Sequence, residues 1–91
     1  MDFEWDEAKR QKVIEARGVD IFFAARIFRG YVLTHSDDRQ AYGEERFISL
    51  GMVGEECFVV VHTQRGNKTR LITAWKGGQD ERDRYQNSFP G

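Results

Sequence analysis

The sequence predicts an α+β domain in which two amino-terminal helices pack on a three- to four-stranded antiparallel sheet, followed by a carboxyl-terminal helix. Apolar residues recur at helical spacing up to residue 30 and alternate with period two up to residue 75, and the segment 79–87 holds few helix breakers. With 91 residues, the chain has room for one modest core and not for two. We therefore expect a single domain over residues 1–91, with the helices gathered on one face of the sheet and the other face partly open.

The two amino-terminal helices are predicted from their capping residues. Asp6 is expected to cap the first helix, because an aspartate side chain accepts hydrogen bonds from the free N–H groups of the first turn. Gly18 follows the last turn, where a left-handed residue commonly ends a helix. Asp20 is expected to cap a second helix that continues to Gly30.

Four segments have strand character, at residues 31–35, 46–52, 57–63 and 69–75. The third is apolar on both faces in its first half and is expected at the centre of the sheet. Residues 65–68 have the composition of a hairpin turn, which would place positions 64 and 69 opposite each other. The final helix, residues 79–87, is expected to dock through Tyr85, and residues 88–91 are expected to fray.

The charges are balanced overall and uneven along the chain. Lysines and arginines number 14 and aspartates and glutamates 15, so the net charge of −1 gives no general nucleic-acid signature. Residues 62–79, however, contain no acid and carry Arg65, Lys68, Arg70 and Lys76. We therefore expect a local basic patch.

The cysteine content and the first residues predict a cytoplasmic protein. A single cysteine, Cys57, excludes an intrachain disulfide and a cysteine-based zinc site, and a reducing compartment suits it best. The start of the sequence is acidic and polar where a signal peptide is basic and then apolar, and no membrane contact is expected. Adjacent acids at 37–38 and 44–45 are typical of a solvated loop, so we expect no metal and no other cofactor.

Several short motifs, taken together and in order, carry a resemblance to a known family. They are Glu4-Trp5-Asp6-Glu7-Ala8-Lys9, Gly18-Val19, Ala24-Ala25-Arg26-Ile27-Phe28, Gly43-Glu44-Glu45-Arg46, Val60-Val61-His62-Thr63-Gln64-Arg65-Gly66 and Arg70-Leu71-Ile72-Thr73-Ala74, with Glu81 and Tyr85 at the end. This series resembles the BrnT family. The resemblance implies a RelE-like ribonuclease fold and the toxin half of a type II toxin–antitoxin pair. Such a toxin cleaves mRNA, inhibits translation and growth, and is silenced by a DNA-binding antitoxin called BrnA. The toxin itself would contact DNA only indirectly, through this antitoxin.

The cations near the hairpin are the predicted catalytic groups. Metal-free RNA cleavage needs an acceptor for the 2′-hydroxyl proton, cations that stabilise the charge of the transition state, and a donor for the leaving oxygen. Arg65 and Arg70 are the predicted phosphate ligands, because a guanidinium group holds two phosphate oxygens and stays charged. Lys68 lies between them and would position the RNA strand. This prediction requires that the two arginines share a face and are not each neutralised by a carboxylate; the alternative is a solvated hairpin.

Proton transfer is assigned to His62 or Lys76. The unperturbed pKa of histidine lies near 6.5 and His62 is the histidine nearest the cluster, although a buried structural role remains the alternative. Related RelE-like toxins use lysine, arginine and tyrosine instead, so the resemblance keeps Lys76 and Tyr85 as candidates, Tyr85 as an RNA-positioning residue. Trp75 could stack on a splayed base of single-stranded RNA or pack in the core.

A second class of function is a non-catalytic interaction module, a degenerate toxin that binds a BrnA-like antitoxin and takes part in repressing its operon. It is favoured by two departures from the family pattern, since Arg17 stands where the family usually has histidine and Trp75 where it usually has arginine. In either case we expect one of the adjacent helical residues Phe22 and Phe23 to be exposed, because the two cannot both face one core, and both are candidate contacts for the antitoxin.

Overall fold

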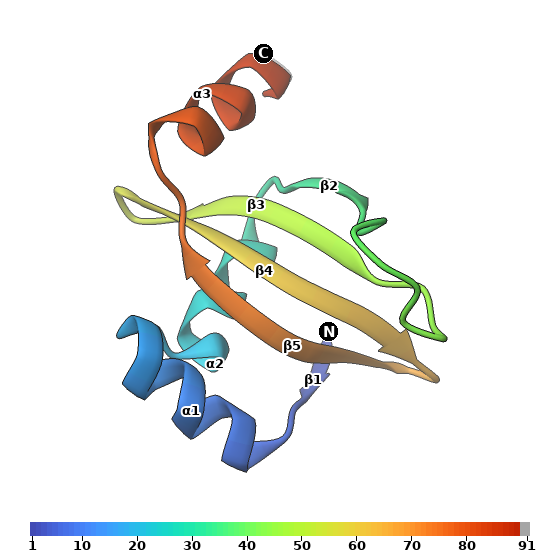
Figure 1. Cartoon of the computed structure of the whole chain (residues 1–91). Coiled ribbons are helices and arrows are strands. Elements are labelled where there is room, and N and C mark those ends of the chain that lie inside the picture. Colours follow the sequence, from blue (N-terminus) through green and yellow to red (C-terminus); the bar gives the residue numbers. More distant parts are fainter. Residues whose placement is uncertain (90–91) are drawn as a thin grey trace.

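The computed structural model describes residues 1–89, in which a five-stranded sheet carries helices on both faces (Figure 1). The strands lie in the order β1-β5-β4-β3-β2. Their bounds are β1 Asp2–Glu4, β2 Leu33–Ser36, β3 Phe47–Val53, β4 Glu56–Arg65 and β5 Lys68–Lys76. The helical elements are α1 Glu7–Arg17, α2 Ile21–Ala24, the 3₁₀ segment η1 Ala25–Arg29 and α3 Gln79–Ser88.

The predicted antiparallel sheet is correct for β2 to β5 and incomplete at its edge. A fifth strand, β1, pairs in parallel with the start of β5, so the sheet is mixed. Phe3 packs against the helix-side core, and the two acids that flank it alternate with it along the strand. Three residues are too few to give a periodic signal in the sequence. The open edge of β5 provides the hydrogen-bonding partner that makes them a strand.

The predicted helix caps are confirmed, but the second helix is shorter than expected. Asp6 accepts from the Lys9 backbone N–H at 3.2 Å, and Gly18 ends α1 with a left-handed φ of 67°. Asp20 begins α2, which completes only one turn before the chain continues as 3₁₀ helix in η1. This segment brings Ile27 onto β3 at Gly51, where an added Cβ would lie 2.6 Å from the Ile27 Cβ.

The central strand has an apolar core on each side, as predicted. Phe58 and Val60 of β4 face α1, α2 and η1, whereas Val59 and Val61 face a second cluster. That second cluster includes Tyr85 of α3, which lies beyond the carboxyl end of β5 in Figure 1. The expectation that all helices gather on one face is therefore wrong, because α3 docks its buried tyrosine on the face opposite α1.

The end of the chain is more ordered than expected as far as it is described. Ser88 is the last residue of α3, and the Phe89 ring lies 5.2 Å from the Tyr31 ring between centroids. Residues 90–91 of the expected frayed end lie outside the described part. Within residues 1–89, no helix combines the length and the apolar character needed to cross a membrane.

Candidate functional site

The hairpin joining β4 and β5 brings three of the predicted cations to one end of one face. Arg65 pairs with Lys68 across the turn, and Thr63 pairs with Arg70. Opposite residues on paired strands share a face, as do residues two apart on one strand. Arg65, Lys68 and Arg70 therefore share the face opposite α1, because the alternate residue Val60 packs in the helix-side core.

Each of the two arginines is paired with a carboxylate. Arg65 Nη2 lies 3.2 Å from Glu44 Oε1, and Arg70 Nη1 lies 2.7 Å from Glu4 Oε2. Glu44 also lies 3.6 Å from Arg46 Nε, so one carboxylate serves two guanidinium groups. The requirement of a shared face is met, and the requirement of unpaired cations is not. An anion that binds these arginines competes with their carboxylate partners.

His62 lies on the other face of the sheet from these arginines. Its ring meets the Phe28 ring edge-on at 5.1 Å, and its Nε2 lies 2.7 Å from Ser49 Oγ, which in turn lies 2.7 Å from Thr34 Oγ1. Burial lowers the pKa of His62 to about 4, so the imidazole is neutral near pH 7. These contacts give His62 a packing role and separate it from the cations by the thickness of the sheet.

Lys76 and Tyr85 also lie apart from the arginines. Lys76 ends β5 opposite Phe58, and its Nζ lies 2.8 Å from Glu56 Oε2. The strand Lys68–Lys76 places this lysine roughly 25 Å from the turn at a rise of about 3.3 Å per residue. Tyr85 is buried and its hydroxyl donates to the Tyr31 carbonyl at 2.9 Å, which makes it the predicted docking residue of α3; burial raises its pKa. The structure thus divides the predicted catalytic set among several places.

Trp75 contacts two arginines that the sequence did not connect with it. The guanidinium carbon of Arg17 lies 5.2 Å from the tryptophan ring and that of Arg39 lies 5.8 Å from it. Arg39 is itself fixed by two bonds to the buried carboxylate of Asp37, at 2.7 and 2.8 Å, and these bonds lower the pKa of Asp37 to about 2. The two positions that depart from the family pattern, Arg17 and Trp75, are therefore in contact. No local sequence signal indicates this, because they are far apart along the chain.

Phe22 and Phe23 line a hollow of about 920 Å³ between β1 and the α2–η1 segment. Both rings are exposed, Phe22 by 50% and Phe23 by 40%, where we expected one of the two. Aromatic and basic residues share the lining, which includes Phe3, Trp5, Phe28, Arg26, Arg29 and Lys68. The lining also includes Asp2 and Asp20, so the hollow presents aromatic side chains beside charges of both signs.

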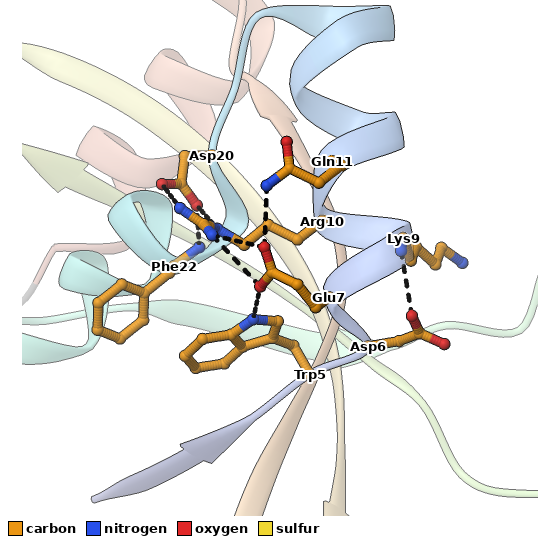
Figure 2. A network of polar contacts seen from close by, with 8 residues as sticks. All are labelled: Trp5, Asp6, Glu7, Lys9, Arg10, Gln11, Asp20 and Phe22. Atoms are coloured by element: carbon orange, nitrogen blue, oxygen red, sulfur yellow. Dashed lines mark hydrogen bonds and ion pairs between the residues drawn. The ribbon is translucent and has the colours of Figure 1, made fainter.

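A polar network fixes the position of Phe22 (Figure 2). Arg10 of α1 makes two bonds of 2.8 Å to Asp20 and one of 2.9 Å to Glu7, which lowers the pKa of Asp20. The Trp5 indole donates to Glu7 at 2.9 Å and its ring lies 4.8 Å from that of Phe22. The hairpin of α1 and α2 is thereby tied together below the exposed ring.

Two further observations bear on identity. Over residues 1–89, no three His, Cys, Asp or Glu side chains form a group that could hold a metal ion. A family model described as the ribonuclease toxin BrnT of type II toxin–antitoxin systems matches residues 5–81. The chain belongs to the BrnT family. The resemblance seen in the sequence is confirmed, and the matched range includes both arginines of the hairpin as well as Arg17 and Trp75. No curated protein matches the chain.

Membership in the BrnT family makes this chain a relative of ribonuclease toxins, whose type II systems imply an RNA target and an antitoxin partner. The match ends at residue 81 and so leaves most of α3, with Tyr85, outside the matched range. The hairpin cations, α1, Phe22 and Phe23 lie within the matched range, whereas β1, which lines one side of the hollow, precedes it.

Proposed function

We propose that this chain is a cytoplasmic endoribonuclease toxin that cleaves mRNA without a metal ion, inhibits translation and growth, and is neutralised by a BrnA-like antitoxin. Family membership supports the reaction class. The observation that carries the choice of site is the common face and common strand end of Arg65, Lys68 and Arg70. Guanidinium groups so placed can bind the same scissile phosphate from two strands.

In this proposal the RNA phosphate replaces Glu44 at Arg65. An ion pair between exposed side chains contributes roughly 0–1 kcal/mol, and the side chain of Arg65 is 50% exposed, so the exchange costs little. We assign the 2′-hydroxyl proton to the carboxylate of Glu44 beside the phosphate, because His62 lies on the other face of the sheet and Lys76 at the far end of β5. As the 2′-oxygen bonds to phosphorus, the bond between phosphorus and the 5′-oxygen breaks and the Lys68 ammonium donates a proton to that oxygen, yielding a 2′,3′-cyclic phosphate and a 5′-hydroxyl. The proton taken up by Glu44 returns to Lys68 through solvent.

The test is cleavage of a single-stranded RNA by the purified protein in EDTA, with end-group analysis of the products. Replacing Arg65 and Arg70 together by alanine should lower the cleavage rate by about 100-fold or more, since loss of one preorganised charge-stabilising donor costs about that much. Replacing Arg82 and Arg84 of α3 by alanine is the matched control and should leave the rate unchanged. Normal cleavage by the Arg65/Arg70 variant would show that the site is elsewhere, and loss of cleavage in EDTA would exclude a metal-free mechanism.

A variant of Glu44 separates proton transfer from phosphate binding. Glu44→Gln removes the proposed acceptor, and with it one negative charge beside Arg65. We expect slower cleavage with equal or tighter RNA binding. Faster or unchanged cleavage would exclude Glu44 as the proton acceptor while leaving the phosphate ligands in place.

The second candidate function is the non-catalytic module that binds an antitoxin and takes part in operon repression. The observation that favours it is that Arg65, Arg70 and Lys76 are each paired with a carboxylate. Expression of this chain alone discriminates the two, because only the nuclease arrests growth without a partner.

For both functions we propose the hollow at Phe22 and Phe23 as the antitoxin-binding surface. Exposed aromatic rings in a hollow are the kind of anchor that stable interfaces bury. Replacing both by serine should abolish a complex with a BrnA-like antitoxin. Circular dichroism of the variant controls for folding, and a complex that survives the change would place the antitoxin elsewhere.

A further inference from the structure

A second groove runs between α1 and the edge of β5. Its volume is about 580 Å³, and three cations line it together with the Thr73 hydroxyl; they are Lys9, Lys12 and Arg17. In Figure 1, α1 lies alongside β5 over this stretch. Asp6 is the single acid in the lining, and its carboxylate already accepts the Lys9 backbone N–H as the cap of α1. The lining thus carries a net charge of two positive units.

The cations of this groove differ from the predicted catalytic cations in their partners. Within residues 1–89, no carboxylate forms an ion pair with Lys9, Lys12 or Arg17. Arg10, on the same helix, turns instead toward Asp20 and Glu7, and Figure 2 shows the Lys9 side chain pointing away from that network. An anion entering the groove therefore displaces no carboxylate.

Arg17 is held in a fixed orientation at the end of the groove. Its Nη1 donates to the Ala74 carbonyl at 3.2 Å and lies 3.4 Å from the Thr73 hydroxyl, while its guanidinium carbon lies 5.2 Å from the Trp75 ring. Its Nε and Nη2 make no hydrogen bond with any described residue, so they remain available to a ligand. Holding the side chain in advance reduces the entropy lost when a ligand binds.

We propose that this groove binds backbone phosphates of single-stranded RNA, with Arg17 and Trp75 forming a stacking surface for a base. The inference rests on the proposed function in taking RNA as the substrate. Lys9 and Lys12 lie on adjacent turns of one helix face, about 5–6 Å apart at Cβ, which suits contacts to successive phosphates. Unpaired bases stack on flat groups such as an indole ring or the plane of a guanidinium group. The carboxylates of an acidic peptide have no ring that could stack there, so this surface favours RNA as the ligand.

The groove also connects with the hairpin cations. Trp75 lies opposite Val59, and both pack on the face of the sheet opposite α1. Arg70 is on the same face, so one face of β5 carries both the stacking surface and a proposed phosphate ligand. Trp75 lies five residue steps along β5 from Arg70, or roughly 16 Å at a rise of about 3.3 Å per residue. A strand of RNA a few nucleotides long therefore reaches from the groove, over the edge of β5, to the proposed cleavage site.

The experiment measures binding apart from cleavage. The probe is a fluorescein-labelled RNA of about 12 nucleotides, within the range of single-stranded sites, with 2′-O-methyl groups that prevent cleavage. Replacing Lys9 and Lys12 by glutamine should raise the Kd about tenfold in low salt and lower the slope of log Kd against log salt by about 1.4, or about 0.7 for each lost phosphate contact. Arg17→Gln should weaken binding further. Arg82→Gln with Arg84→Gln removes the same number of charges and should change the Kd less than twofold.

Two results would overturn the inference. The first is a folded Lys9/Lys12 variant whose Kd for the labelled RNA stays within twofold of the wild-type value. The second is a polyglutamate peptide of the same length that competes with the labelled RNA as well as unlabelled RNA does, which would indicate an acidic protein partner. The Arg65/Arg70 variant separates this inference from the proposed function. If that variant loses cleavage while the groove variant binds and cleaves normally, the nuclease stands without the groove. If binding depends on Lys9 and Lys12 while the wild type cleaves no RNA, the groove stands without the nuclease.

Discussion

Replacement of His62 by glutamine tests whether this imidazole packs the core or carries a proton. The residue is partly buried and its ring lies against those of Phe28 and Phe47; this burial lowers its pKa to about 4 from the usual 6.5. The unfolded chain therefore binds a proton between these two pH values that the folded chain does not bind. Stability is fully present above pH 6.5 and falls as the pH decreases toward 4, because protonation favours the unfolded state.

The expected loss follows from this shift. Between pH 7.5 and pH 5, linkage with pKa values of 6.5 and about 4 gives about 2 kcal/mol, which we reduce to about 1–2 kcal/mol because the ring keeps some solvent contact. Urea unfolding of the wild type and of His62→Gln at both pH values measures it. The difference in free energy of unfolding between the wild type and His62→Gln should increase by that amount from pH 5 to pH 7.5, because glutamine does not titrate. The titration of the carboxylates affects both proteins equally and cancels in this difference.

Two outcomes would contradict this interpretation of His62. Parallel stability profiles of the two proteins would show that the folded imidazole titrates normally. A His62→Gln protein that is folded at pH 7.5 and cleaves RNA at least 100-fold more slowly would give His62 the catalytic role predicted from the sequence. His35→Gln, on an exposed part of β2, is the matched control for the loss of a histidine and should leave the rate of RNA cleavage unchanged.

Three further changes test other parts of the structure. Gly51→Ala should destabilise the fold by about 1–3 kcal/mol, measured by urea unfolding, because its Cβ would lie 2.6 Å from Ile27 Cβ; an unchanged midpoint would contradict the close contact of η1 with β3. Tyr85→Phe should cost about 1 kcal/mol by losing the bond to the Tyr31 carbonyl and should leave RNA cleavage unchanged, whereas loss of cleavage in a folded protein would restore the predicted RNA contact. Cys57 should react with a thiol reagent such as dithionitrobenzoate only on unfolding, because it is buried and burial raises its pKa; rapid reaction of the native protein would show that β4 opens locally.

Local signals account for the parts of the fold that the sequence predicted well. Asp6, Gly18 and Asp20 cap their helices because each cap needs only hydrogen bonds within one turn, so a few neighbouring residues determine it. The hairpin at residues 65–68 is similarly local, and the predicted pairing of positions 64 and 69 is the one observed. The apolar run on both faces of β4 indicated its central place, since a strand covered on one side alone would alternate.

Contacts between segments far apart in the sequence determine the features of the fold and of the site that the sequence did not predict. β1 is a strand only because β5 offers it an open edge, and α3 took the face opposite α1 because Tyr85 fits the apolar cluster there. The sequence placed Arg65 and Arg70 at one end of a hairpin correctly, but it could not show that Glu44 and Glu4 would reach them.

The sequence by itself determined the family, the caps, the hairpin and the supply of cations. The tertiary structure alone decided which cations are paired with carboxylates, that His62 lies on the other face of the sheet from Arg65 and Arg70, and that Arg17 reaches Trp75. The physical reason is one of range. Capping and strand alternation depend on bonds between near neighbours, whereas the field at a side chain depends on the charges that folding brings within a few ångströms from distant segments.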